Sequence, residues 1–306
     1  MSETIYIAQS DDWSNYVALY GWKSFKIKNG SILRIRGNFF TRRAAMQIPK
    51  ELSIIDLEEI EEICRTNKVH YLKISPNEGQ NLKYLEQFKY KQTKNIDLAP
   101  NTMYIDLTPD TQAIFNHFSN SCRYSINKAK RERCYTEIIR NPTPKEILEF
   151  YKVLSYRAKK KHFTILGLKD IQKKVESFGE NSFICNIYNE KGQILGAKFF
   201  LGFGDVVWGI HSGTTKLGQK STAGYKLLFD CVPYFKSLGY RKMDLGGIRD
   251  PRLKNLSKGW EHYSHYKREF NGKVIYYSLP YYKWFYSLTN VRATPFLSAL
   301  PVLPIL

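Results

Sequence analysis

The sequence predicts an α/β protein built from two similar units in tandem, on three observations. At 306 residues the chain exceeds the usual size of one domain. Short runs rich in β-branched and aromatic residues alternate with longer amphipathic runs. A strand, a broken turn, a short basic element and an aromatic-lysine ending occur in that order twice, over 70–91 and 240–267. We therefore expect a duplicated α/β unit with its joint near 98–110, the alternative being coincidence between short motifs.

The first half reads as strand, helix and strand. SILRIRGNFF (31–40) predicts a strand, and SIIDLEEIEEICRT (53–66) predicts a helix with acidic residues on its outer face. The apolar stripe of that helix consists of Ile54, Leu57, Ile60 and Cys64. VHYLKIS (69–75) predicts a second strand, which ends at Pro76. We place the first domain at 1–105.

The second half repeats this order with longer strands. Residues 184–210 predict a three-strand meander with turns at 190–192 and 202–205. A helix follows over GYKLLFDCVPYFKSLGY (224–240) and ends near Gly239. Its inward residues are Leu227, Leu228, Cys231, Val232 and Phe235. We place the second domain at 106–290, followed by an apolar, proline-containing tail at 291–306.

Two glycines follow the strand that begins at 240. In YRKMDLGGIRDP, Gly246 and Gly247 permit backbone conformations or close approaches that a Cβ atom would block. We expect another group to pass close to this turn, the alternative being a plain structural turn.

The net charge narrows the class of partner. The chain has 47 Lys and Arg against 28 Asp and Glu, a formal charge of +19. Such a surplus attracts polyanions, either nucleic acid or anionic lipid headgroups. The alternative is a solvated basic surface with no polyanionic partner.

Cysteines and histidines give no sign of a metal. The five cysteines are scattered and the six histidines have no paired spacing, so we expect a reducing cytoplasm and no structural zinc. The N-terminal stretch lacks the pattern of a secretory signal, and no segment has the roughly 18 to 20 apolar residues of a spanning helix. We expect a cytoplasmic protein whose tail packs on the core or touches the inner membrane surface.

Four sequence pieces together carry a resemblance. They are CRYSINKAKRE (122–132), GQKSTAGYKLL (218–228), MDLGGI (243–248), and the pair Tyr266-Lys267 followed by Phe270-Asn271-Gly272. In this order the chain resembles the Fem family of peptidoglycan bridge-forming aminoacyltransferases. The resemblance covers most of 106–277, and the absence of a long heptad run makes this an armless form.

The resemblance implies a fold and a reaction. The fold would be two tandem acetyltransferase-like (GNAT) domains with mixed sheets flanked by helices. The activity would be transfer of an amino acid from aminoacyl-tRNA, without a cofactor, to a peptidoglycan precursor, a lipid- or UDP-linked muropeptide. It would serve peptidoglycan biosynthesis, and through it cell-wall biogenesis and cell shape.

Two departures leave the acceptor open. Ser75-Pro76 stands where relatives often show Asp-Pro, and the lysine often found after the N-terminal Trp has no counterpart near Trp13. In relatives that bind UDP-linked muropeptide these positions concern the acceptor site.

The expected catalytic residues follow from the chemistry of ester aminolysis. An enzyme can orient the amine and stabilise the tetrahedral oxyanion. By resemblance, Lys267 would supply the cation, with Tyr266, Gly246 and Gly247 beside the substrate. Asp244 ranks below it as acceptor of the amine proton. The alternative for Lys267 is solvation of an aromatic strand edge.

His211 is a further candidate. It ends the WGIH strand before the glycine-containing loop and can act as a general base. A buried, hydrogen-bonded histidine is the more common explanation.

The sequence of the loop before the 224–240 helix distinguishes between two candidate acyl donors, acyl-CoA and aminoacyl-tRNA. Acyl-CoA enzymes hold pyrophosphate on backbone amides of a glycine-rich loop at a helix N-terminus. Here Thr222 replaces the first glycine, which disfavours acyl-CoA. Lys216 and Lys220 remain candidates for another phosphate, of tRNA or of a nucleotide-linked sugar, and Tyr225 for substrate binding.

A cationic run provides the candidate tRNA contacts. On the helix expected near 122–132, the basic residues are Arg123, Lys128, Lys130, Arg131 and Arg133. Spacing along the helix lets some of them share one side and meet phosphates. The alternative is a solvated helix face.

The sequence therefore predicts an enzyme, an aminoacyl-tRNA-dependent aminoacyltransferase. An acyl-CoA-dependent N-acyltransferase acting on a sugar or peptide amine is the alternative. A nucleic-acid-binding protein that has lost catalysis is a third possibility.

Overall fold

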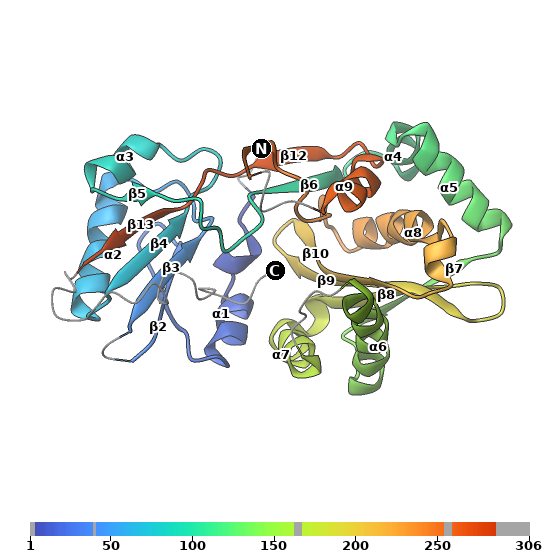
Figure 1. The fold of residues 1–306 in the computed structure, drawn as a ribbon, viewed down its shortest axis with the longest axis horizontal. Coiled ribbons are helices and arrows are strands. Elements are labelled where there is room, and N and C mark those ends of the chain that lie inside the picture. The colour runs from blue at the N-terminus through green and yellow to red at the C-terminus, as the bar shows by residue number, and fades with distance from the viewer. Residues whose placement is uncertain (1–3, 39–40, 162–166, 254–258, 286–306) are drawn as a thin grey trace. The chain divides into compact units, whose positions relative to one another are not determined.

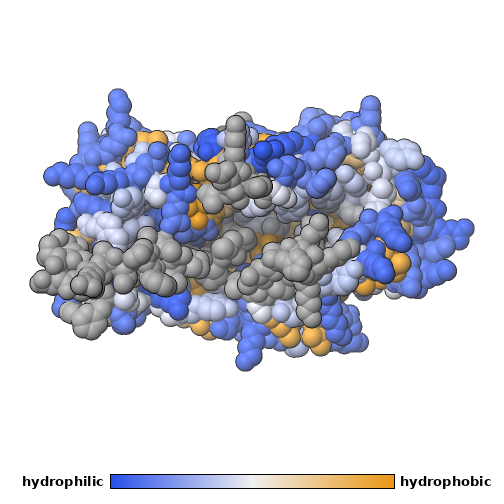
Figure 2. All heavy atoms as spheres, viewed as in Figure 1, coloured by the Kyte–Doolittle hydropathy of each residue, from blue (hydrophilic) through white to orange (hydrophobic). Residues whose placement is uncertain are grey.

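The computed structural model describes residues 4–38, 41–161, 167–253 and 259–285. The described residues form two compact units, one within 4–101 together with 275–285 and the other within 102–274. Each unit has its own mixed sheet (Figure 1). The expected tail, 291–306, lies outside the described residues. Within the described residues no helix is long and apolar enough to cross a membrane. Hydrophilic residues make up most of the described surface on the face in Figure 2.

The first unit has a six-stranded sheet in the order β1-β2-β3-β4-β13-β5. Its strands are β1 (Lys23–Lys26), β2 (Ile32–Arg36), β3 (Arg43–Gln47), β4 (Tyr71–Ser75), β13 (Tyr281–Trp284) and β5 (Lys91–Gln92). Only the β3–β4 pair is parallel among these, and helix α2 (Ile54–Thr66) connects its two strands. The remaining helices are the 3₁₀ turn η1 (Ile7–Gln9), α1 (Asp11–Ala18) and α3 (Leu82–Gln87).

Helix α2 forms where its sequence predicts. Ser53 and Asp56 make a reciprocal capping box at its first turn, which satisfies backbone N–H groups that a helix start leaves unpaired. Leu57, Ile60 and Cys64 are buried in the core of the unit. The acidic residues expected on the outer face do not all stay there, because Glu61 is buried and pairs with Lys283 of β13.

The second unit has a seven-stranded sheet in the order β12-β6-β11-β10-β9-β8-β7. Its strands are β6 (Asn101–Asp106), β7 (Tyr135–Arg140), β8 (Ser182–Tyr188), β9 (Ile194–Phe203), β10 (Val206–Thr214), β11 (Lys242–Asp244) and β12 (Lys273–Tyr276). The β10–β11 pair is parallel, and helix α8 (Ala223–Ser237) connects its strands. The expected meander is β8, β9 and β10.

Helices cover both faces of this second sheet (Figure 1). Helices α8 and α5 (Asn120–Arg131) pack together on one face. Helices α6 (Pro144–Lys161) and α7 (Leu168–Phe178) lie on the other. The shorter elements are α4 (Thr111–His117), α9 (Glu261–Arg268) and the 3₁₀ turns η2 (Gly179–Asn181), η3 (Gly218–Lys220) and η4 (Pro251–Leu253). Apolar residues of β8–β11, α5 and α8 make one core.

The two units share one topology. In the first, β1, β2 and β3 lead through α2 to β4, and in the second, β8, β9 and β10 lead through α8 to β11. An antiparallel strand then borders the last strand in each sheet, β13 in the first and β6 in the second. The predicted fold class, two mixed sheets flanked by helices, is therefore confirmed.

The division of the chain differs from the expected boundaries at one end. Residues 281–284 form β13 and complete the first sheet, although they lie within the range expected for the second domain. The N-terminal segment of the first unit ends at Asn101, the first residue of β6. Strand partners far apart in sequence decide both points, and a local pattern does not contain them.

Candidate active site

The parallel strands β10 and β11 pair over only three residues. Val206–Trp208 face Lys242–Asp244, after which β10 has an irregularity between Gly209 and His211. A Cβ on Gly209 would lie 2.7 Å from the Asp244 carbonyl oxygen, so only glycine permits this approach. Beyond Asp244 the chain turns through Gly246, whose φ is +72°. Ligands of open α/β sheets bind outside the carboxyl ends of strands, which makes this turn the candidate site.

Lys267 reaches this turn from helix α9. Its side chain is 2% exposed, and Nζ donates to the Gly247 carbonyl oxygen at 2.7 Å. The ammonium also lies 3.9 Å from the ring centroid of Tyr263, within the range of a cation–π interaction. Lys267 is therefore a buried cation on a helix and does not solvate the edge of an aromatic strand.

Asp244 is the acidic partner in the same turn. Its carboxylate accepts hydrogen bonds from the Thr102 hydroxyl and, at 2.8 Å, from the Gly246 backbone N–H. Burial raises the pKa of Asp244 to about 6, against the opposite effects of Thr102, Lys267 and the Gly246 N–H. The carboxylate is therefore mostly ionised at pH 7.

These neighbours explain why residue 246 is a glycine. A Cβ on Gly246 would lie 3.4 Å from Lys267 Nζ and 3.9 Å from an Asp244 carboxylate oxygen. The positive φ independently favours glycine. The group that the sequence predicted to pass close to this turn is the Lys267 ammonium.

The segment after the turn is tied to α9. The backbone N–H of Arg249 donates to the Ser264 hydroxyl at 2.7 Å, and Ser264 is buried. Asp250 is fully buried and pairs with Arg252 at 2.7 Å. Lys267 and the turn thus belong to one packed assembly.

Aromatic residues join α9 to the start of α8. The Tyr266 hydroxyl donates to the Gly224 carbonyl oxygen at 2.7 Å, and its ring centroid lies 4.7 Å from that of Tyr225. Burial raises the pKa of Tyr266 well above its usual value and that of Tyr225 to about 12, so both phenols are neutral. These two predicted substrate-binding residues position α9.

The loop between β10 and α8 exposes its lysines. Lys216 and Lys220 are both exposed. At the helix start the Ala223 N–H donates to the Ser221 hydroxyl at 3.0 Å and the Tyr225 N–H to the Thr222 carbonyl oxygen at 3.1 Å. The Thr222 hydroxyl donates to the Ser125 carbonyl oxygen at 3.0 Å. The backbone N–H groups of Ala223 and Tyr225 are therefore already engaged within the chain.

His211 lies on β10, where its side chain is partly exposed. Burial, and secondarily the nearby Lys174 ammonium, lower the pKa of His211 to about 3. Lys174 is itself buried and pairs with Asp170 of α7 at 2.5 Å. The imidazole is consequently neutral at pH 7 and is a weak base.

The cationic run uses its side chains in different ways. The guanidinium of Arg123 donates to the Asn116 and Phe118 carbonyl oxygens at 2.6 and 2.7 Å, at the end of α4. Lys130 lies over the Phe229 ring at 5.1 Å and Arg131 over the Tyr124 ring at 5.9 Å.

The two remaining members of the run have acidic neighbours. Lys128 lies 3.9 Å from Glu132. Arg133 stands beyond the end of α5 with a φ of +52° and lies 3.9 Å from Glu190. Arg133 therefore does not continue the helical face expected from its spacing.

Thr102 and Tyr263 are the site residues that sequence reasoning missed. Thr102 lies in a strand 142 residues before Asp244, and its hydroxyl has no motif around it. Tyr263 stands four residues before Lys267, the spacing that places side chains together on a helix. Reading 261–268 as a helix would have indicated Tyr263, whereas nothing local indicates Thr102.

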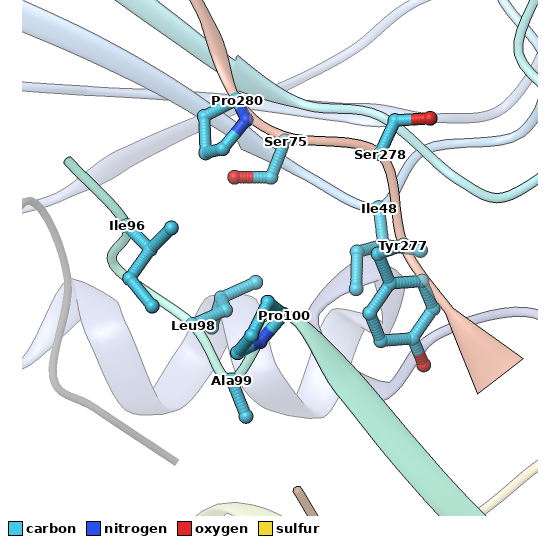
Figure 3. Close-up of a pocket in the computed structure, with 9 residues that line it drawn as sticks. All are labelled: Ile48, Ser75, Ile96, Leu98, Ala99, Pro100, Tyr277, Ser278 and Pro280. Carbon is cyan, nitrogen blue, oxygen red and sulfur yellow. The ribbon is translucent and has the colours of Figure 1, made fainter. Parts of the chain in front are cut away.

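The first unit contains a pocket at the carboxyl ends of β3 and β4 (Figure 3). It is lined by Ile48, Ser75, Ile96, Leu98, Ala99, Pro100, Tyr277, Ser278 and Pro280. No lining residue is charged, and the two serine hydroxyls point in opposite directions in this view. Ser75, the last residue of β4, contributes one of these hydroxyls.

Solved structures share this fold. No protein-family model matches the sequence, and no curated protein matches it. FemX is similar with a TM-score of 0.77 over 91% of this chain and 92% of its own, at 11% identity. The fold is FemX-like. The resemblance read from the four sequence pieces is thereby confirmed for the fold.

Two further solved structures support the fold assignment. One is the C-terminal domain of an Agrobacterium fabrum protein named as a lysylphosphatidylglycerol synthetase (TM-score 0.63, 12% identity, 91% of this chain and 88% of that one). The other is a tandem GNAT protein from the clavulanic acid biosynthesis pathway (TM-score 0.50, 10% identity, 84% and 81%). The second bears out the expectation of tandem GNAT-like units.

Proposed function

We propose that this FemX-like protein is an aminoacyltransferase that moves an amino acid from aminoacyl-tRNA to an amine of a peptidoglycan precursor peptide. The observation that carries the proposal is the buried Lys267 ammonium at the turn after β11. The two similar proteins named FemX and lysylphosphatidylglycerol synthetase support a reaction of this class.

Lys267 acts on the carbonyl oxygen of the donor ester. The acceptor amine attacks the ester carbon, and the carbonyl oxygen gains negative charge in the tetrahedral intermediate. A lysine ammonium has three N–H groups, of which the Gly247 carbonyl accepts one. Another can donate to the oxyanion. Collapse of the intermediate forms the amide bond, breaks the ester bond to the tRNA ribose and returns a proton to the ribose oxygen.

Asp244 and His211 differ as candidates for taking the amine proton. Asp244 is ionised and adjacent, but both of its oxygens already accept hydrogen bonds. His211 is neutral and weakly basic because of its partly buried position. We therefore assign neither as an obligatory base, since the released amine proton can pass through water.

The charge of the protein favours an anionic donor and acceptor. A formal charge of +19 suits the phosphates of tRNA and of a lipid- or UDP-linked muropeptide. Lys216, Lys220, Lys128 and Arg131 are the cations we assign to such phosphates. A lipid-linked acceptor would place the protein peripherally on the inner membrane face.

The acyl-CoA alternative is less well supported. Its pyrophosphate needs free backbone N–H groups at the start of α8. Those of Ala223 and Tyr225 already donate within the chain.

The test is a transfer assay with charged tRNA and a panel of muropeptide precursors, scored by mass spectrometry. We expect a mass gain of one amino acid residue, and Lys267→Met should lower the rate roughly 100- to 1,000-fold. Lys191→Met, at an exposed hairpin lysine, is the matched control and should retain the rate. Full activity of Lys267→Met would remove Lys267 from the mechanism. No gain on any acceptor, with saturable acetyl-CoA binding instead, would select the acyl-CoA alternative.

A further inference from the structure

Thr102 and Asp244 form a buried hydrogen-bonded pair beside Lys267. Both are 4% exposed, and the Thr102 hydroxyl donates to one carboxylate oxygen of Asp244. In the antiparallel β6–β11 ladder, Asp244 faces Tyr104 and the Leu245 N–H donates to the Met103 carbonyl oxygen at 2.8 Å. Continuing this register places Thr102 opposite Gly246. The pair therefore stands where β11 becomes the turn.

The second carboxylate oxygen of Asp244 holds the turn itself. It accepts the Gly246 N–H at 2.8 Å, an interaction that closes the chain two residues after Asp244. The carbonyl oxygen of the following residue, Gly247, accepts a hydrogen bond from Lys267 Nζ at 2.7 Å. A continuous series of contacts thus runs from Thr102 through Asp244 and the turn to the ammonium.

Charge acts in the same direction as these hydrogen bonds. A Cβ atom on Gly246 would lie within 4 Å of both an Asp244 oxygen and Lys267 Nζ, so the two charged groups lie on the same side of this residue. A buried ammonium without an anion nearby is costly to keep protonated. The positive charge of Lys267 in turn favours the ionised form of the Asp244 carboxyl.

We propose that Thr102 and Asp244 are positioning residues that aim the Lys267 ammonium at the developing oxyanion. The hydroxyl orients the carboxylate, the carboxylate orders the Gly246-Gly247 turn, and the turn carbonyl together with the carboxylate charge holds Nζ. Asp244 is then not the acceptor of the amine proton. This inference rests on the proposed transferase function and adds Thr102, a residue no sequence motif marks.

Three substitutions test the Thr102 hydroxyl and the Asp244 charge separately. Thr102→Val keeps the shape but removes the hydroxyl, whereas Thr102→Ser keeps the hydroxyl and is the rescue variant. Asp244→Asn keeps an acceptor for the Gly246 N–H but removes the charge. We expect kcat to fall roughly tenfold or more in Thr102→Val and Asp244→Asn, with KM for charged tRNA little changed, and Thr102→Ser to stay near the wild type.

A second readout does not depend on activity. Hydrogen exchange of the backbone amides in 245–250, followed by mass spectrometry, reports the order of the turn. Thr102→Val should speed this exchange, and Thr102→Ser should not. The inference is overturned if Thr102→Val and Thr102→Ser behave alike in both measurements, or if Asp244→Asn keeps the wild-type kcat.

The two readouts distinguish this inference from the proposed function. A wild-type protein that transfers nothing contradicts the proposed function, and the exchange measurement then still decides whether Thr102 and Asp244 order the turn. A protein that transfers normally, but whose rate and turn exchange ignore all three substitutions, contradicts this inference alone.

Discussion

At the scale of single residues, the site depends on the absence of a Cβ atom at Gly246. Gly246 combines a left-handed backbone conformation with two charged neighbours on the side where a Cβ would project. Gly204, in the β9–β10 hairpin, has a similar φ of +60° with no atom within 4 Å of its Cβ position. Substitutions at these two glycines can therefore distinguish the effect of backbone strain from the effect of crowding Lys267.

Gly246→Ala and Gly204→Ala should accordingly differ in activity. Each should lower the free energy of unfolding by about 1 kcal/mol or more, because alanine is strained at a positive φ. Gly246→Ala should in addition lower the transfer rate roughly tenfold to a hundredfold, because its methyl group displaces Nζ. Urea unfolding and single-turnover transfer measure the two effects. Equal rates in both variants would show that the ammonium tolerates displacement.

His211 illustrates how burial changes the meaning of a residue. In the sequence it resembles a general base with an ordinary pKa. In the structure, burial and the Lys174 ammonium lower its pKa to about 3, and its ring stacks on Phe199 with centroids 6.3 Å apart. The neutral imidazole fits a packing role on β10.

At the scale of elements, helix α5 divides its cations between folding and surface. Arg123 donates to carbonyl oxygens that the end of α4 would otherwise leave unpaired. Arg131 is exposed, and its guanidinium lies over the Tyr124 ring. Spacing on the helix does not distinguish these two uses.

Arg123→Gln and Arg131→Gln should therefore affect different properties. Arg123→Gln should lower the free energy of unfolding by about 1 to 2 kcal/mol and leave the salt dependence of tRNA binding unchanged. Arg131→Gln should leave stability unchanged and reduce the slope of log affinity against log salt by about one. Urea unfolding and fluorescence anisotropy at several salt concentrations make the comparison. A reduced slope in Arg123→Gln would show that Arg123 contacts the phosphates of the RNA.

At the scale of the whole molecule, the chain returns to its first unit to complete the sheet. Strand β13 pairs with β4 and β5, and its Lys283 bonds to Glu61 of α2 and, at 2.8 Å, to the Phe88 carbonyl oxygen. The Glu61 side chain is only 5% exposed. The first unit thus depends on residues far along the sequence.

Lys283→Met should destabilise the first unit. Removing one partner of a buried ion pair leaves the other charge poorly compensated, and we expect a loss of about 3 kcal/mol. Lys91→Met, on the exposed strand β5, is the control and should stay within about 0.5 kcal/mol of the wild type. Hydrogen exchange of 54–66 would locate the change. Glu61 also pairs with Arg65 of α2 at 2.6 Å. Unaltered protection of α2 in Lys283→Met would show that Arg65 alone compensates Glu61.

The sequence by itself determined the features that depend on neighbouring residues. The helix expected at 53–66 is α2, and the strands expected at 31–40 and 69–75 contain β2 and β4, because hydrophobic periodicity and caps act within a few residues. The repeat of strand, turn and helix indicated two similar units, and the glycine turn with its aromatic-lysine pair indicated where the site lies. Each of these signals is local.

Only the tertiary structure decided which residues meet. It placed Thr102 against Asp244 across 142 positions, assigned 281–284 to the first sheet, and set Lys267 on a buried helix face. It also bound the Arg123 guanidinium to carbonyl oxygens at the end of α4 and made His211 neutral. Sheet register, burial and the resulting electrostatics come from segments distant in sequence, and no local pattern of residue types encodes them.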